Sequence, residues 1–292
     1  MIAIVGVLAA LCVAGLGLWP GSSLAVRVAA RWRSAPVVGG GLESSGLLPG
    51  KPKTELKPLP VKATDIKIRQ SGWFSWALLD TRTGQLSGPA DRTALSTTAS
   101  LIKPWIAADF LRRAAEQGQA PSDDQLEQIE SMIRDSDNEA AESLYIENGR
   151  EESIRRLIST CGLGDSKVAD DGGWSRTLLS PADITRLGAC IADGRAAGPA
   201  WTTFLLDQMR AVTGMGDFGI RKAFPQDEQS KIAIKNGWID REEEQEFHVS
   251  CMAIGDGWVV GVMSRYEIDK DYEYGAKICE LVGEQLREAA GG

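Results

Sequence analysis

Hydrophobic and polar residues divide this chain into three stretches of different pattern. Residues 2–19 form an unbroken apolar run, and glycines and prolines interrupt any periodicity between residues 36 and 60. From about residue 65 onward, apolar positions recur at the spacings of strands and helices. The pattern predicts a signal peptide or membrane anchor over residues 1–25, a flexible linker over 26–64 and one folded domain over 65–292.

The folded part begins and ends with strand patterns and is helical between them. Residues 73–80 alternate and are followed by turn residues at 81–84, which predicts a hairpin with a second strand over 85–88. Later strands are predicted over 230–236, 246–254 and 258–265, with a closing helix over 271–289. Intervening helices are predicted over 100–117, 122–133, 138–148, 151–161, 181–193 and 199–212. This order indicates a single α/β (α+β) domain.

The apolar leader supports two interpretations, which stay open. Its length lies between that of a signal-peptide core and that of a short membrane helix, and small residues ending at Ala25 favour cleavage there. Three arginines, the first at Arg27, follow the run instead of preceding it, which is opposite to the usual charge bias for export. Lipid attachment at Cys12 is less favoured, because bulky Leu11 precedes it. An extracytoplasmic protein, secreted or anchored by residues 2–19, is expected in either case.

Composition excludes some partners. Of the 292 residues, 43% are hydrophobic and 25% are charged, which is an ordinary globular balance, and the net charge is -8. An acidic protein is a poor match for nucleic acid, whose phosphates attract basic patches. The acidic residues 242–246 have no His or Cys ligands at suitable spacing, so they predict a solvated loop and no metal site.

Four cysteines lie beyond the leader, at Cys161, Cys190, Cys251 and Cys279. Outside the cytoplasm they could form two disulfides, but spacing alone does not give the pairing. Buried free thiols are an equally good interpretation.

Three short motifs carry the candidate chemistry. They are Ser100-Leu101-Ile102-Lys103, Ser136-Asp137-Asn138 and Lys235-Asn236-Gly237, in that order. Ser100 and Lys103 are three apart, so on a helix their side chains share one face and can meet. A serine hydroxyl needs a base to become a nucleophile, and a lysine can serve when its pKa is lowered. The chain has only one histidine, His248, within a strand pattern, so a Ser-His-Asp triad would leave the three motifs unexplained.

The ordered motifs resemble the S-x-x-K, S-D-N and K-T-G signature of the serine β-lactamase and penicillin-binding protein superfamily. The class A β-lactamases are closest in layout, over roughly residues 70–290, and residues 204–225 are similar to that family's helix and connector before the third motif. The resemblance implies a mostly antiparallel sheet formed by both chain ends, with an inserted helical lobe.

The resemblance also implies a role for each motif residue, with no metal or organic cofactor. Ser100 would be the nucleophile, Lys103 its base and Ser136 a proton relay toward the leaving nitrogen. Asn138 would bind the substrate's amide, and Lys235 would lower the pKa of Lys103 and attract a substrate carboxylate. The substrate-binding strand would include Asn236, where a hydroxyl is usual, and Gly237. The backbone N–H groups of Ser100 and Trp238 would form the oxyanion hole, and Trp238 would also form part of the substrate wall.

One departure from class A sets the expected activity. The water-activating glutamate of that class lies in a Glu-x-x-Leu-Asn pattern, but residues 164–180 contain no glutamate. The acids there, Asp165, Asp170 and Asp171, are expected to be loop and turn residues. We therefore expect an exported serine acyl-enzyme hydrolase that acts on an amide or D-Ala-D-Ala-like peptide, with slow deacylation of β-lactams. Its partner would be a small-molecule or cell-wall peptide substrate, with attachment to the membrane through the leader. The alternative is a catalytically weak cell-wall binding or sensor module.

One further motif is discounted from its context. Residues 214–219 spell G-x-G-x-x-G, but they follow a helical pattern and open no clear helix, so a dinucleotide site is not expected.

Overall fold

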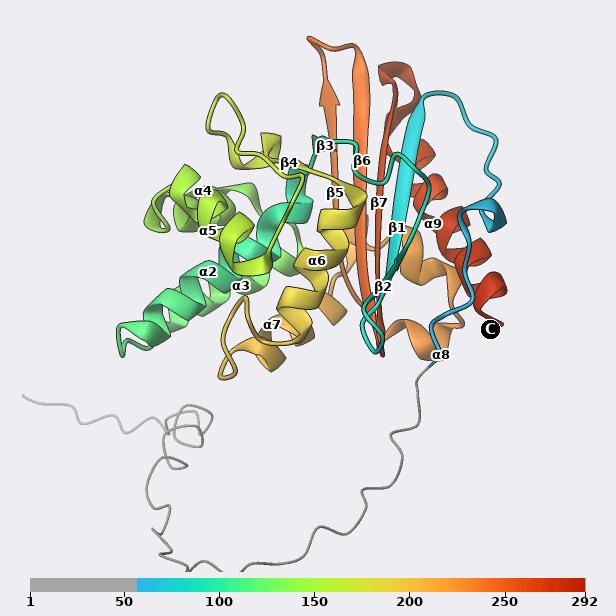
Figure 1. The fold of residues 1–292 in the computed structure, drawn as a ribbon. Coiled ribbons are helices and arrows are strands. Elements are labelled where there is room, and N and C mark those ends of the chain that lie inside the picture. The colour runs from blue at the N-terminus through green and yellow to red at the C-terminus, as the bar shows by residue number, and fades with distance from the viewer. Residues whose placement is uncertain (1–56, 292) are drawn as a thin grey trace, which may run out of the picture. The chain divides into compact units, whose positions relative to one another are not determined.

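An antiparallel sheet combines strands from both ends of the folded domain. The computed structural model describes residues 57–291, and its five-stranded sheet has the order β2-β1-β7-β6-β5 (Figure 1). The strands are β1 (Trp73–Asp80), β2 (Gln85–Ser87), β5 (Ala233–Arg241), β6 (Glu246–Gly255) and β7 (Trp258–Glu267). The predicted sheet is confirmed, and β5 is one of its edge strands.

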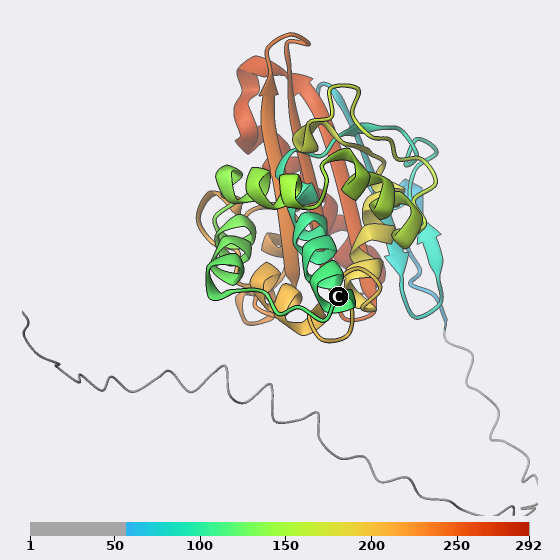
Figure 2. The ribbon, with the colours of Figure 1, turned by 90° about the vertical axis from the view of Figure 1, so that its left-hand side faces the viewer.

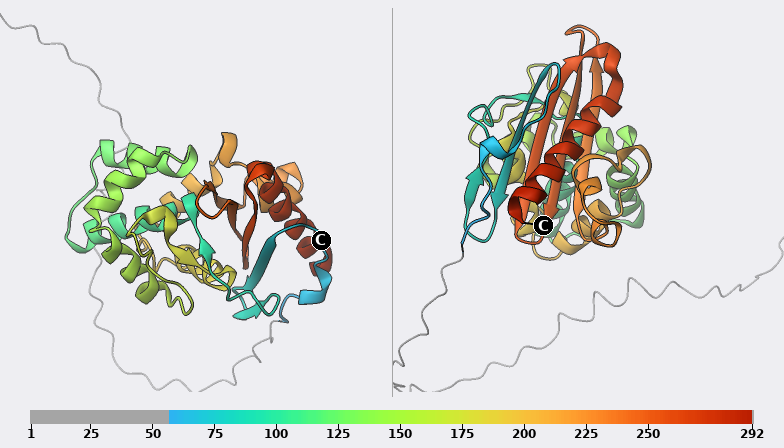
Figure 3. Two further views of the ribbon diagram at one scale, coloured as in Figure 1. Left: turned by 90° about the horizontal axis from the view of Figure 1, so that it is seen from above. Right: turned by 90° about the vertical axis from the view of Figure 1, so that its right-hand side faces the viewer.

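Helices cover both faces of this sheet. On one face lies α9 (Asp271–Ala290), and on the other lies α6 (Pro181–Ala192), which packs on β1, β6 and β7 (Figures 1 and 3). The helical lobe lies on the α6 side and appears in front of the sheet in Figure 2. It comprises α2 (Lys103–Glu116), α3 (Asp123–Arg134), α4 (Asn138–Glu147), α5 (Glu151–Cys161) and α7 (Thr202–Arg210), and the short α8 (Gln226–Gln229) precedes β5. A two-stranded ribbon, β3 (Ser96–Thr97) with β4 (Leu178–Leu179), joins the lobe to the sheet.

Local sequence signals fix several helix ends. The Ser122 side chain accepts a hydrogen bond from the Gln125 backbone N–H, and the Gln125 side-chain oxygen accepts one from the Ser122 backbone N–H, which is the predicted capping box of α3. Pro181 lies at the first turn of α6, whose N-cap Ser180 accepts from the Asp183 N–H. Gly162 ends α5 with a φ of 66°, a conformation that favours glycine.

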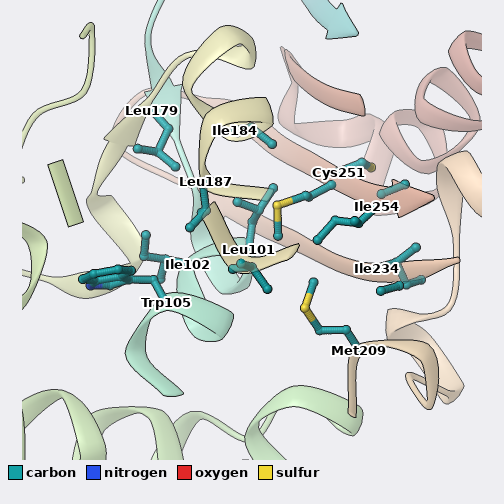
Figure 4. Close-up of a cluster of buried hydrophobic side chains, with 14 of the residues drawn as sticks. Leu101, Ile102, Trp105, Leu179, Ile184, Leu187, Met209, Ile234, Cys251 and Ile254 are labelled. Atoms are coloured by element: carbon teal, nitrogen blue, oxygen red, sulfur yellow. The ribbon is translucent and has the colours of Figure 1, made fainter. Parts of the chain in front are cut away.

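The hydrophobic core reaches the first motif directly. Leu101 and Ile102 are fully buried, and they pack in a cluster with Ile234 of β5, Cys251 of β6 and Leu187 of α6 (Figure 4). Two consecutive buried side chains therefore anchor the residues that follow Ser100. The core fixes the backbone of the candidate nucleophile, since packed interiors leave little room for displacement.

Two disulfides resolve the cysteine pattern. Cys161 of α5 pairs with Cys190 of α6, and Cys251 of β6 pairs with Cys279 of α9. Each links residues that adjoining elements bring together, and this is the information that spacing along the sequence lacks. The interpretation as free thiols is wrong for these four residues.

Removing either disulfide is expected to destabilise the domain. The paired cysteines are 29 and 28 residues apart, and loops of this length correspond to about 3–4 kcal/mol in the chain-entropy model. Urea unfolding of the Cys161→Ala/Cys190→Ala variant, compared with the wild type under non-reducing conditions, measures this loss. The Cys251→Ala/Cys279→Ala variant, measured in the same way, gives the loss of stability for the second disulfide. A change below about 1 kcal/mol in both variants would contradict the expectation.

The folded domain extends slightly further toward the N-terminus than expected. The Leu59 N–H donates to Asp80 Oδ2 at 3.0 Å, Val61 is buried, and residues Ala63–Asp65 form a short 3-10 helix. The last residues of the predicted linker thus pack on β1. The predicted leader, its cleavage site and Cys12 lie outside the described residues. Among residues 57–291, no helix is long and apolar enough to cross a bilayer.

Candidate active site

Ser100 lies in a tight turn between the ribbon and the lobe. The turn is a 3-10 helix over Ala99–Ile102, and α2 begins immediately after it at Lys103. Ala99 has a φ of 45°, which is uncommon for a residue with a side chain and is found where the surrounding structure enforces it. Ser100 is partly exposed between the buried Ala99 and Leu101. The turn therefore presents one hydroxyl from an otherwise buried segment.

Lys103 is fully buried, and its ammonium group points at the second motif. Nζ donates to the Ser136 carbonyl oxygen at 2.5 Å, to Ser136 Oγ at 3.2 Å and to Asn138 Oδ1 at 2.8 Å. Among residues 57–291, no hydrogen bond joins Ser100 to Lys103. The two instead converge on the same neighbours, because Ser100 lines a hollow with Ser136 and Asn138.

The second motif is held in place by its backbone. Ser136 has a φ of 63°, and the Asp137 side chain accepts from the Ala140 N–H at 2.9 Å, which caps α4. Because α4 begins at Asn138, the cap fixes the position from which Asn138 reaches Lys103. Ser136 thus forms the turn, Asp137 caps the helix, and Asn138 accepts a hydrogen bond from Lys103.

Burial shifts both site lysines toward the uncharged amine. Removal from water lowers the pKa of Lys103 to about 7, and Asp137 partly opposes this shift. The pKa of Lys235 also lies well below its ordinary value, mainly through burial and further through the nearby Lys103. The resemblance implies that the charge of Lys235 lowers the pKa of Lys103. Burial is instead the principal cause.

The third motif lies against the nucleophile turn. A side chain added at Gly237 would place its Cβ only 2.2 Å from the Thr98 carbonyl oxygen and 2.7 Å from the backbone nitrogens of Ser100 and Leu101. Only glycine permits this approach of β5 to the turn. Lys235, on the same strand, is fully buried and donates from Nζ to the Ile133 carbonyl oxygen at 3.1 Å.

The side chain of Asn236 is held within the fold. Its Nδ2 donates to the carbonyl oxygens of Gly216 at 3.0 Å and Phe218 at 2.8 Å, and the residue is buried. Both amide hydrogens are therefore used to hold the connector before β5. This arrangement differs from the expected substrate-binding role, because the Asn236 amide donates to two backbone carbonyl groups and has no N–H left to donate to a substrate.

Two adjoining hollows of about 330 and 320 Å³ meet at Ser100, Asn138 and Trp238. The first is completed by Ala99, Glu142, Trp174, Ser175 and Ile239. The second is completed by Asp135, Ser136, Thr213, Gly214 and Met215. Trp238, predicted as a substrate wall, lines both hollows, so the cleft has room for a chain on each side of the Ser100 hydroxyl.

Trp174 and Glu142 complete the site, although neither belongs to the three motifs. The Trp174 ring lies over Lys103, with Nζ 5.1 Å from its centroid, and its Nε1 donates to Glu142 Oε2 at 3.1 Å. Glu142 also accepts from Arg150 at 3.2 Å. A sequence signal existed for Glu142, which lies four residues after Asn138 and so on the same face of α4.

The segment that carries Trp174 is tied down on several sides. Tyr145 Oη donates to the Gly172 carbonyl oxygen, and Arg241 Nη2 donates to that of Ser175, both at 3.0 Å. Arg176 forms ion pairs with Asp171 and Glu244. Glu244 belongs to the acidic 242–246 segment, which forms the exposed turn between β5 and β6 and part of the start of β6.

Other candidates have structural roles. The single histidine, His248, is buried, and its ring nitrogens lie 2.7 Å from Thr97 Oγ1 and 3.1 Å from Glu246 Oε2. Asp165 accepts from Ser180 Oγ, and Asp171 accepts from the Gly173 N–H, as expected of loop and turn residues. Residues Gly214–Gly216 form one short 3-10 turn and Gly219–Ala223 a second, so no long helix opens from the G-x-G-x-x-G stretch.

The chain is similar to known proteins in sequence and in structure. The chain is 28% identical to the Mycobacterium tuberculosis protein named "Putative lipoprotein LppW" over 198 residues, which are 66% of this chain and 63% of that protein. The chain thus spans about 63% of the length of that curated relative. The beta-lactamase from Sphaerobacter thermophilus has a TM-score of 0.60 and 15% identity, covering 75% of this chain and 92% of its own. A class A beta-lactamase from Mycobacterium abscessus has the same TM-score and identity, with 76% and 95% covered.

These structural similarities establish the fold, which is that of the class A beta-lactamases. A family model described as "Beta-lactamase enzyme family" matches residues 125–289, which contain the second and third motifs. Because that match spans more than half of the chain, the protein belongs to the beta-lactamase enzyme family.

Proposed function

We propose that the protein is an exported serine hydrolase that cleaves or transfers an amide or related acyl bond through an acyl-enzyme on Ser100. The observation that carries the proposal is the buried Lys103, whose pKa is lowered to about 7 and whose Nζ contacts the same Ser136 and Asn138 that share a hollow with Ser100. A lysine that is half uncharged near neutral pH can accept a proton from a hydroxyl.

Acylation would proceed across this cleft. Uncharged Lys103 retains two N–H groups for the Ser136 carbonyl oxygen and Asn138, and its lone pair then accepts the Ser100 proton, directly or through Ser136 Oγ. Ser100 Oγ attacks the acyl carbon, and the backbone N–H groups of Ser100 and Trp238 stabilise the oxyanion. As an edge strand, β5 leaves alternate N–H groups unpaired with β6. The proton passes by Ser136 to the leaving group as its bond to the acyl carbon breaks.

Hydrolysis of the acyl-enzyme would be the slow step. A base must activate the attacking water, and residues 164–180, where class A enzymes carry their glutamate, contain none. Of the two carboxylates that line the Ser100 hollows, Glu142 already accepts hydrogen bonds from Trp174 and Arg150, and Asp135 lies on the side of the leaving group. The Trp174 ring lies over Lys103, with Nζ 5.1 Å from its centroid, and would limit the approach of water from that side. The acyl-enzyme should therefore accumulate.

Location outside the cytoplasm has independent support. Two disulfides are typical of oxidising compartments, and the mycobacterial relative carries the name of a lipoprotein. Together with the apolar run over residues 2–19, these observations support a domain exported and held at the membrane by its N-terminal segment.

Intact-mass spectrometry tests the proposal. The purified protein is incubated with neutral activated esters, thioesters and a fluorescent penicillin, and any adduct is located by peptide mapping. We expect a one-to-one adduct on the Ser100 peptide that persists after the free donor is removed. No adduct with any donor on folded protein would favour a catalytically weak binding or sensor module. Rapid nitrocefin turnover would contradict slow deacylation.

The rate of adduct formation should depend on the titration of Lys103. Because only the uncharged amine can accept the Ser100 proton, the rate should rise as pH rises through the pKa of about 7 and level off about one unit above it. Below pH 6 the rate should fall about tenfold per pH unit. Stopped-flow measurement with a neutral thioester, whose own charge is constant, gives this profile. A flat profile between pH 5.5 and about 8.5 would exclude Lys103 as the base.

A further inference from the structure

The hollow beside Ser136 is the place for the leaving group, if the proposed function holds. Ser136 is the residue proposed to pass the proton to the leaving atom, and the group that departs must lie next to it. We call it the leaving-group hollow, and its lining includes Asp135, Ser136, Thr213, Gly214 and Met215. Its charges and walls decide which leaving groups fit.

The groups expected to bind a carboxylate do not reach this hollow. Lys235 has 0% exposure, and its Nζ is directed at the Ile133 carbonyl oxygen. The Asn236 amide is used by the Gly216 and Phe218 carbonyl oxygens. No Lys or Arg is among the described residues that line either hollow. An anionic leaving group would have to enter without a surface cation to pair with it.

The exposed charge in the leaving-group hollow is negative. Asp135 is exposed, and its carboxylate forms no hydrogen bond or ion pair within residues 57–291. It is also the C-cap of α3, so the negative end of that helix dipole adds to its charge. The Arg134 guanidinium next to it in sequence is paired with Glu130. The buried Lys235 feels the Asp135 charge but forms no ion pair with it, so the carboxylate is open to an incoming cation.

The walls of the hollow suit an alkylated cation. Met215 is 60% exposed and is one of two exposed large hydrophobic residues in the described chain, and the half-buried Trp238 lines the same hollow. Phe218 and Tyr272 pack against the Trp238 ring and hold it in place. A polarisable thioether and an indole face bind alkyl ammonium groups favourably.

We propose that the leaving-group hollow selects acyl donors whose leaving group carries a cationic amine and no carboxylate. Ser100 Oγ then forms the ester bond, the bond from the acyl carbon to the leaving nitrogen, oxygen or sulfur breaks, and the Ser100 proton ends on that departing atom. Asp135 is a specificity determinant and takes no part in the bond changes.

Three thioesters with one phenylacetyl group test the selection. Their leaving thiols are the cationic thiocholine, the neutral 3,3-dimethylbutanethiol and the anionic 3-mercaptopropionate. The quaternary nitrogen of thiocholine cannot take the acyl group from sulfur, so this ester does not rearrange to an amide. Acylation of Ser100 is monitored by the release of thiol and by intact-mass spectrometry. Each acylation rate is divided by the rate at which the same ester reacts with hydroxide, which corrects for its intrinsic reactivity. We expect the cationic ester to react at least ~10-fold faster than the anionic one at low salt, with the ratio falling as salt screens the interaction.

A matched pair of variants assigns the preference. Asp135→Asn should lower the cationic-to-neutral rate ratio by about fivefold to tenfold. Glu127→Gln removes the same charge from an exposed position of α3 that lines neither hollow, and should leave the ratio unchanged. An anionic ester that reacts as fast as the cationic one, or a ratio that Asp135→Asn does not alter, would overturn the inference. If none of the three esters modifies Ser100, the proposed function itself fails.

Discussion

Replacing Lys103 with methionine is expected to slow acylation of Ser100 by about 10³-fold, within the range that positioned general bases contribute. Methionine fills most of the fully buried lysine volume with an unbranched apolar side chain, so the change removes the amine and its three hydrogen bonds with little change of packing. Stopped-flow acylation with a neutral thioester measures the loss. The remaining rate should lose the dependence on pH near 7, because the titrating base is gone.

Two controls separate catalysis from folding in this experiment. Ser100→Ala should give no adduct at all, and its partly exposed position should leave the unfolding transition nearly unchanged. Circular dichroism and urea unfolding of Lys103→Met show whether the site is still assembled. A folded Lys103→Met variant that acylates within about tenfold of the wild type would remove Lys103 from the proposed mechanism.

The order of strands and helices could be predicted because local patterns determine most of it. Residues 73–80 and 151–161 form the predicted strand and helix with the predicted bounds. The strand β5 shows the limit of this approach, because it runs over Ala233–Arg241 and not 230–236. Its last residue, Arg241, looks like part of an acidic loop in the sequence, yet it is buried and donates to the Ser175 carbonyl oxygen. That contact joins segments that are distant in the sequence, so the residues around Arg241 give no indication that it is buried.

The candidate site was predictable to the extent that spacing determines it. The separation of three positions between Ser100 and Lys103 places both on one side of the turn and helix, and the ordered motifs predicted that β5 would lie nearby. The direction of Asn236 was not predictable, because the carbonyl groups that hold it belong to an irregular connector. Nor was the contact of Trp174 with Glu142, which lie 32 residues apart on different elements.

The proposed mechanism implies a balance between acylation and deacylation that follows from these same contacts. In that mechanism, burial keeps Lys103 available as a base for forming the acyl-enzyme, while the Trp174 ring and the hydrogen-bonded Glu142 hinder activation of a water. We therefore expect the protein to form the acyl-enzyme and to turn over slowly. Such behaviour suits a transferase or a long-lived acyl-enzyme better than rapid hydrolysis.

Gly237→Ala is expected to reduce acylation of Ser100 by at least about 10²-fold, because a displacement near 1 Å in a reacting group can have that effect. The new Cβ would meet the Thr98 carbonyl oxygen at 2.2 Å and the Ser100 and Leu101 nitrogens at 2.7 Å. All three are backbone atoms of a turn that Leu101 and Ile102 anchor in the core, so the strand and the turn must separate. We also expect a loss of about 1–3 kcal/mol in unfolding free energy, as for other overpacked sites.

Gly164→Ala is the matched control for this substitution. A Cβ at Gly164 would have no neighbour closer than the Arg186 guanidinium at 4.0 Å, and this glycine does not have a positive φ. The same added methyl group should therefore leave both acylation and stability nearly unchanged. If Gly237→Ala instead acylates at the wild-type rate, β5 does not fix the Ser100 turn, and an oxyanion hole shared between Ser100 and Trp238 would no longer be tenable.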